Sequence, residues 1–235
     1  HQPAPNNRIT GELPTEIKFL QGVAGSVFKK TSVRRSGSDP ATGATIPAPA
    51  NVTLGVGPLD PGITAAFVGA AAGQPEFEAT LRINVANTVP VGTYQVKVTG
   101  TAPPVAPKLE TTQLVRVYGA VDGGAYIEIS PQEVTLTPGS TATVTATVTN
   151  IPPYAGNVTV TYPGAGTALP TGVTVAGRTS YTFPIGGAVT TVSKQFILIA
   201  ADNATGGTFP SAEVRTGPAA PGAKTDTAPH IVMVR

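Results

Sequence analysis

The sequence predicts an all-β protein built from two tandem copies of one antiparallel sandwich domain. Three observations lead to this prediction. First, the 235 residues include 27 glycines and 24 prolines but only 12% charged residues, against roughly 25% in an average globular domain. Second, apolar residues occur in short alternating runs separated by turn residues, which is typical of strands. Third, the two halves of the chain carry the same sequence markers in the same order.

The repeat is clearest in two stretches that align without a gap, residues 81–94 and residues 196–209. The other matched segments are 51–54 with 157–160, 59–64 with 169–174, and 115–118 with 232–235. Their spacing grows only from 106 residues (51 to 157) to 117 residues (115 to 232). An ordered set of markers at nearly constant spacing indicates a duplicated domain.

The first copy begins after a polar, proline-containing segment. We expect residues 1–12 to form an arm, flexible or donated as a strand to a neighbouring molecule, with Ile9 and Leu13 as its assembly contacts. Domain 1 is expected at residues 13–118. Its predicted strands are 16–20, 26–35, 51–56, 77–85, 92–99 and 111–118, with a loop over 36–50.

The glycine-rich residues 119–125 predict a linker, and residues 126–235 predict domain 2. Its clearest strand is 140–149, in which alanine and valine alternate with threonine. Period two is the pattern of a half-buried antiparallel strand. The other predicted strands are 134–136, 157–162, 190–200, 208–216 and 229–234, and Pro210 predicts an edge strand or a bulge.

Residues 51–67 and 90–100 resemble the immunoglobulin-like repeats of bacterial and archaeal secreted and cell-surface proteins. In that family a turn of the type Leu-Pro-Pro-Gly-Val-Thr and a Gly-Thr-Tyr strand recur, and residues 169–174 and 207–209 resemble these motifs again. The resemblance implies two tandem immunoglobulin-like sandwiches and an extracellular or cell-surface location. It carries no catalytic motif, because such modules act as spacers, filament subunits or adhesive surfaces.

Composition excludes several classes of protein. The absence of cysteine excludes a disulfide scaffold and a cysteine-based zinc site. A net charge of +2 does not support a nucleic-acid partner. No apolar run approaches the roughly 20 residues of a membrane span. The start at His1 lacks the features of a signal peptide, so we expect a removed leader or a trimmed chain.

Catalytic and metal sites have weak support, so we expect neither an enzyme nor a cofactor. The two histidines, His1 and His230, come without a nucleophile elbow. A remote alternative is a copper-dependent polysaccharide oxidase in which His1 binds copper and His230 completes the site. Asp122 and Asp202 are calcium candidates, but turn-forming aspartate is the plainer interpretation.

The densest cluster of charge lies on one predicted strand. It consists of Lys29, Lys30, Arg34 and Arg35. Such a strand fits either a site for an anionic polymer or the solvated, aggregation-resistant face of an edge or exposed strand.

Glycan contact requires exposed aromatic rings. The tyrosines available for it are Tyr118, Tyr126, Tyr154, Tyr162 and Tyr181, whereas Tyr94 and Phe209 hold equivalent repeat positions and are assigned to the two cores. Asn51, Asn157 and Asn203 begin acceptor sequences for N-glycosylation.

These observations favour a non-enzymatic extracellular structural subunit of a surface filament, sheath, layer or adhesin. Exposed strand edges and the arm suggest a homo-oligomer or polymer, or contact with other surface proteins. The alternative is a monomeric module that binds carbohydrate or another surface.

Overall fold

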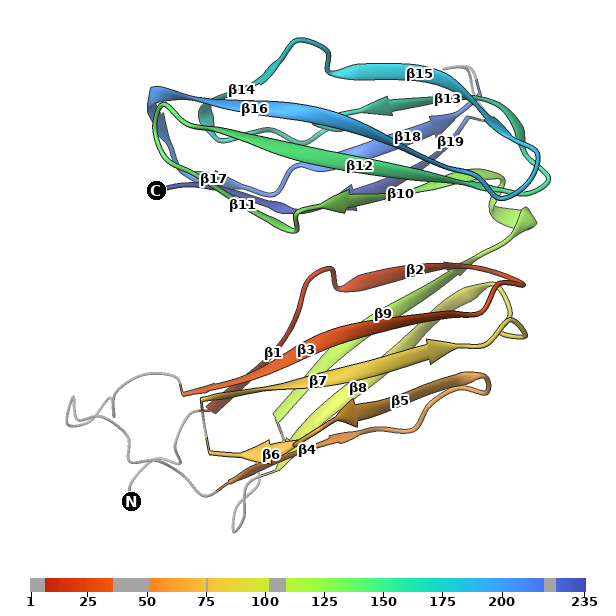
Figure 1. Cartoon of the computed structure of the whole chain (residues 1–235), viewed down its shortest axis with the longest axis vertical. Coiled ribbons are helices and arrows are strands. Elements are labelled where there is room, and N and C mark those ends of the chain that lie inside the picture. The colour runs from red at the N-terminus through yellow and green to blue at the C-terminus, as the bar shows by residue number, and fades with distance from the viewer. Residues whose placement is uncertain (1–6, 36–50, 75, 102–108, 218–222) are drawn as a thin grey trace. The chain divides into compact units, whose positions relative to one another are not determined.

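The computed structural model describes residues 7–35, 51–74, 76–101, 109–217 and 223–235. The chain divides into two compact units, His1–Val117 (unit 1) and Tyr118–Arg235 (unit 2). Both units are built from strands (Figure 1), which confirms the predicted all-β, tandem immunoglobulin-like fold.

Unit 1 contains two sheets. The first has the order β1-β3-β7-β5 and the second the order β2-β9-β8-β4-β6. The strands are β1 Asn7–Gly11, β2 Glu16–Leu20, β3 Gly25–Arg35, β4 Val52–Val56, β5 Ile63–Val68, β6 Ala72–Gly73, β7 Phe77–Val85, β8 Gly92–Thr101 and β9 Leu109–Tyr118. Side chains that alternate inward along the strands form the core, including Val33, Leu81, Ile83, Val96 and Val115.

Unit 2 contains two four-stranded sheets, β10-β12-β16-β14 and β15-β13-β18-β19, and a three-stranded sheet, β11-β20-β17. A short 3-10 helix, Ala120–Asp122, precedes them. The strands are β10 Gly124–Ser130, β11 Glu133–Leu136, β12 Thr141–Ile151, β13 Ala155–Thr161, β14 Thr171–Ala176, β15 Ser180–Gly186, β16 Thr191–Thr205, β17 Gly207–Thr208, β18 Ser211–Thr216, β19 Lys224–Pro229 and β20 Ile231–Val234. As predicted, β12 turns its valines inward and most of its threonines outward.

The two units repeat one strand order and one register. Sheet β1-β3-β7-β5 corresponds to β10-β12-β16-β14, and in each unit the next strand, β6 or β15, returns to pair with β4 or β13. Leu81 lies opposite Lys29, and its repeat partner Phe196 lies opposite Val144. The central strand pairs therefore correspond residue by residue.

The start of unit 2 differs from the predicted linker at residues 119–125. Strand β10 begins at Gly124, because Ala125 already packs into the core. Tyr118 donates a hydrogen bond to Asp226 Oδ1 at 2.8 Å and stacks on Tyr126, and Asp226 Oδ2 accepts from the Ile127 backbone at 2.9 Å. The carboxylate of Asp226 thus anchors the first residues of the unit.

The second copy departs from the repeat around Pro210. Phe209 is 73% exposed rather than in the core, whereas Tyr94 is half-buried against the core of unit 1. Pro210 lies between β17, which is at the edge of its sheet, and β18, which pairs with both β13 and β19, so the predicted edge strand is found only before Pro210. Proline has no N–H to continue a ladder, and the break turns Phe209 outward.

Candidate functional site

The predicted basic surface does not form as one patch. Strand β3 lies between β1 and β7, so it is not an edge strand. Lys29 is only 5% exposed, whereas Lys30 is exposed, because successive side chains of a strand point to opposite faces. The Arg34 guanidinium lies 3.1 Å from Glu78 and 3.9 Å from Glu76. The side chain of Arg35 lies outside the described residues.

The predicted arm folds onto its own unit. Residues Asn7 to Gly11 form β1, which pairs antiparallel with β3 and places Ile9 opposite Val33. Ile9 is half-buried and packs against the core. Residues 1–6 of the arm lie outside the described residues. In this structure the described part of the arm is therefore an edge strand of unit 1.

A cavity of about 220 Å³ lies beneath β1 and the segment that follows it. Its lining brings together four residues singled out by the sequence, Ile9, Leu13, Lys29 and Lys30. Buried Leu81 and Val98 form part of the wall. The cavity is the candidate functional site, because it combines a concave apolar surface with a buried ionisable group.

Lys29 is the polar centre of the site. Its Nζ donates to the Pro14 carbonyl at 3.0 Å. Burial lowers the pKa of Lys29 from 10.5 to about 8, and the carboxylate of Glu12 opposes this shift. That carboxylate accepts a hydrogen bond from the Lys30 backbone at 2.7 Å. The lysine is therefore desolvated and only weakly compensated by negative charge.

Gln113 holds the segment above Lys29 in place. It is buried, and its Nε2 donates to the Thr15 carbonyl at 2.6 Å and to the Leu114 carbonyl at 3.0 Å. The sequence analysis did not single out Gln113. Its available signal was the alternation of β9, which places Gln113 on the same inward row as Val115.

Among the residues that the structure describes, His230 belongs to no group of three side chains able to hold a metal ion. It is 3% exposed, and its ring nitrogens lie 2.7 Å from the Tyr162 hydroxyl and 2.9 Å from the Pro131 carbonyl. Burial lowers its pKa. Both ring nitrogens are thus engaged inside unit 2, and His1 lies outside the described residues, so the arrangement gives no support to the copper hypothesis.

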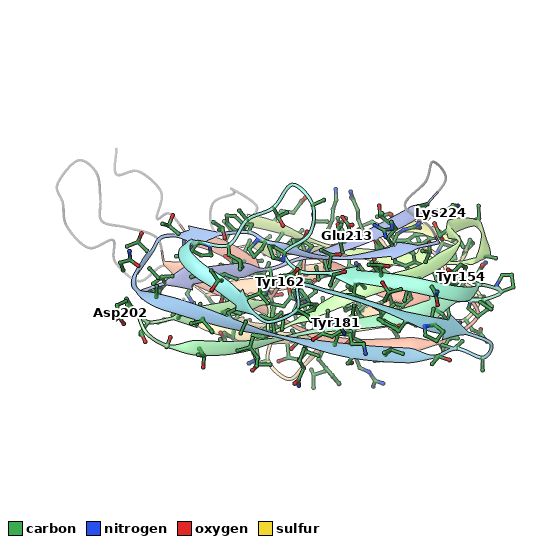
Figure 2. The ribbon with its side chains drawn as sticks, turned by 90° about the horizontal axis from the view of Figure 1, so that it is seen from above. Tyr154, Tyr162, Tyr181, Asp202, Glu213 and Lys224 are labelled. Carbon is green, nitrogen blue, oxygen red and sulfur yellow. The ribbon has the colours of Figure 1, made fainter. Side chains whose placement is uncertain are left out.

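The calcium candidates, Asp122 and Asp202, lie on different elements of unit 2. Asp122 accepts a hydrogen bond from the Gly119 backbone at 2.8 Å. Asp202 is exposed within β16 rather than on a separate turn, at one end of unit 2, with Tyr154 and Lys224 at the other end (Figure 2). Within the described ranges, no three His, Asp or Glu side chains are close enough to bind a metal ion together.

Most of the tyrosines considered for glycan contact are not free to stack. Tyr118, Tyr126 and Tyr162 are buried, and the Tyr154 hydroxyl donates to the Asn157 carbonyl at 2.6 Å. Of the five tyrosines considered for glycan contact, this leaves Tyr181, which is half-buried.

Two cations lie over the Tyr181 ring. Arg178 Cζ is 5.4 Å from its centroid and Lys194 Nζ is 5.3 Å from it. Tyr181 is therefore the tyrosine best placed for a polar ligand.

The asparagines of the three N-glycosylation sequences, Asn51, Asn157 and Asn203, are all exposed. Across the described residues, no helix has the length and apolarity needed to cross a bilayer.

Comparisons with known proteins return structural likeness only. No family model matches the sequence, and no curated protein matches it. A chimeric titin Z1Z2 tandem functionalised with a fibronectin peptide is 16% identical at a TM-score of 0.26, covering 99% of this chain and all of that one. The fibronectin(III)-like modules of Clostridium thermocellum CbhA are 13% identical at a TM-score of 0.26, and the match covers 96% of this chain and 94% of that one.

Dpr2 Ig1-Ig2, solved in complex with DIP-Theta Ig1-Ig3, is also 13% identical, with a TM-score of 0.28 and coverage of 97% and 99%. At these scores the likenesses add nothing to the fold assignment, which rests on the strand order within each unit. A tandem immunoglobulin-like sandwich is consistent with a non-enzymatic structural or binding module.

Proposed function

We propose that the chain is a non-enzymatic extracellular subunit of a surface filament, sheath, layer or adhesin, and that copies assemble by exchanging strand β1. The observation that carries the proposal is the place of β1. It is a five-residue edge strand with a cavity of about 220 Å³ beneath it.

The packing of β1 favours exchange. One flank pairs with β3, and its inward side chain Ile9 is only half-buried. A void removes the dispersion contacts that normally hold a strand to its core. The same β1 from a second copy would restore every pairing with β3, so exchange changes few contacts.

Exchange of this kind gives a head-to-tail contact between two different surfaces. Such heterologous contacts produce rings where the rotation closes and open filaments where it does not. A strand donated along a chain of copies therefore fits an extended surface assembly.

Engineered cysteines test the exchange directly, because the chain has no cysteine of its own. Ile9 and Val33 are opposite one another in the β1–β3 register, and Val33 is fully buried. We expect a mixture of the single variants Ile9→Cys and Val33→Cys to form disulfide-linked dimers under oxidation. The double variant should lock β1 within its own chain, abolish assembly, and regain assembly on reduction.

A matched control uses the pair Thr31 and Ala79, which are opposite in the permanent β3–β7 pair and both 3% exposed. Mixed Thr31→Cys and Ala79→Cys variants should give no linked dimers. Equal cross-linking by both pairs, or assembly by the locked double variant, would refute the exchange. Deletion of residues 1–12 should leave both units folded but unassembled, and filaments of the deleted chain would also refute it.

The second candidate function is glycan binding at Tyr181. It is favoured by Arg178 and Lys194, which are over the ring and, within the described part of the chain, have no carboxylate within 4.0 Å. An acidic polysaccharide such as polygalacturonate should bind the chain, and Lys194→Gln should weaken that binding while Lys97→Gln should not. Equal binding by both variants would remove this candidate.

A further inference from the structure

Lys29 occupies a core position of the repeat. In β3 it lies opposite Leu81, and the corresponding residue of unit 2, Val144, lies opposite Phe196. Val144 and Phe196 are buried, at 0% and 1% exposure. The fold itself therefore builds this position from an apolar side chain, and nothing in the sandwich requires a cation there.

The buried amine forms no ion pair among the described residues, and Glu12 acts on it only from beyond ion-pair distance. No carboxylate in the described ranges lies within 4.0 Å of Lys29 Nζ, and its hydrogen bond goes to the neutral Pro14 carbonyl. Buried charges are ordinarily paired, because desolvation without a partner costs several kcal/mol. A protonated Lys29 carries three N–H donors, so donors remain for an anion that enters the cavity.

The rest of the cavity is suited to an apolar body. Ile9, Leu13, Leu81 and Val98 line it. Its volume of about 220 Å³ is below the roughly 300 to 1,000 Å³ of sites for drug-sized ligands. We propose that the cavity beneath β1 binds a small monocarboxylate, whose carboxylate pairs with Lys29 and whose apolar body contacts these four side chains.

Binding at Lys29 carries a pH signature. The titratable side chains that line the cavity are Glu12, Lys29 and Lys30; β7, β8 and β9 contribute none. Glu12 repels an anion, so the ligand requires the protonated form of Lys29. Because the pKa of Lys29 is about 8, affinity should be full below pH 8 and fall as the pH rises above it.

The test titrates butanoate and its neutral analogue butanamide into the full chain at pH 7 and pH 9.5, followed by amide chemical shifts. We expect butanoate to bind at pH 7 and to bind up to about 30-fold more weakly at pH 9.5. Butanamide should show no such difference. Lys29→Met should abolish the binding of butanoate, and Lys97→Met on the outer face of β8 should not.

Several results would overturn the proposal. One is an affinity of the Lys29→Met variant for butanoate that equals that of the wild type. The others are an affinity for butanoate that does not change with pH, and no binding of any straight-chain acid from acetate to hexanoate. Amide spectra of each variant show whether unit 1 remains folded. Because monomeric chains suffice for the titration, failure of strand exchange would leave this proposal standing, and the reverse also holds.

Discussion

Gly62 lies against Val89, so that a Cβ added at Gly62 would be 2.7 Å from Val89 Cγ2. Gly62 also has a φ of +86°, a left-handed conformation that side chains avoid. The repeat builds the same contact in unit 2, where a Cβ at Gly172 would be 2.9 Å from the Ala204 backbone. Each glycine is thus needed both for its conformation and for its close packing.

Gly62→Ala should therefore destabilise unit 1 by about 2 to 4 kcal/mol, through strain and overpacking together. Gly22→Ala is the matched control, because Gly22 has a similar φ of +84° with no atom within 4 Å. It should cost only about 1 kcal/mol. Urea unfolding of both variants measures the difference, and equal losses would show that the contact with Val89 contributes nothing.

Lys29→Met should stabilise unit 1 by about 1 kcal/mol or more, because it replaces a buried amine with an apolar side chain of similar length. In the native protein the pKa of Lys29 is lowered from 10.5 to about 8. Between pH 8 and 10.5 the unfolded chain thus binds more protons, so the stability of unit 1 should rise with pH across this window. Urea unfolding at pH 8 and 10 should show this rise in the wild type and a smaller one in the variant.

Tyr162→Phe should destabilise unit 2 by about 1 to 3 kcal/mol, because it leaves a ring nitrogen of buried His230 without its partner. Burial lowers the pKa of His230 below 6.5, so the folded state keeps the ring neutral while the unfolded chain takes up a proton. The stability of unit 2 should hence fall as the pH drops below 6.5. A His230→Gln variant whose acid sensitivity matches the wild type would contradict this assignment.

Phe209→Ser should change stability by less than about 0.5 kcal/mol, because the ring is 73% exposed. Phe196→Ala, at a position that is 1% exposed, should cost about 3 to 5 kcal/mol. Thermal unfolding of the two variants compares an outward and an inward aromatic of the same unit. A large loss for Phe209→Ser would restore the core assignment made from the repeat.

Much of the fold follows from local pattern. The alternation of β12 and the alignment of Leu81 with Phe196 predicted strands and core positions correctly, since period two belongs to the strand itself. Strands β14 and β15 were missed as separate elements. Both lie at sheet edges. Tyr181, Phe183 and Ile185 of β15 alternate toward the core, so a signal for this strand was present in the sequence.

The candidate site was harder to predict than the strands, because its lining residues come from segments far apart in the sequence and meet only in the folded unit. Val27, Lys29 and Val33 share one inward row, so alternation alone places Lys29 inside, but a cation in a dense basic run argued for a solvated face. The pairing of β1 with β3 leaves no local signal in a short polar segment. The alignment of Phe209 with Tyr94 predicted a core position for Phe209. The prediction was wrong because Pro210, which has no N–H for a strand hydrogen bond, separates β17 from β18 at this point.

The two hydrogen bonds accepted by the Asp226 carboxylate have a mechanical consequence. Its two oxygens hold the Tyr118 side chain and the Ile127 backbone at once, and Tyr118 is the residue through which the chain enters unit 2. A pull on the chain at that point is transmitted to β19 through a charged side chain as well as along β10. The point of entry therefore resists tension by loading several hydrogen bonds together.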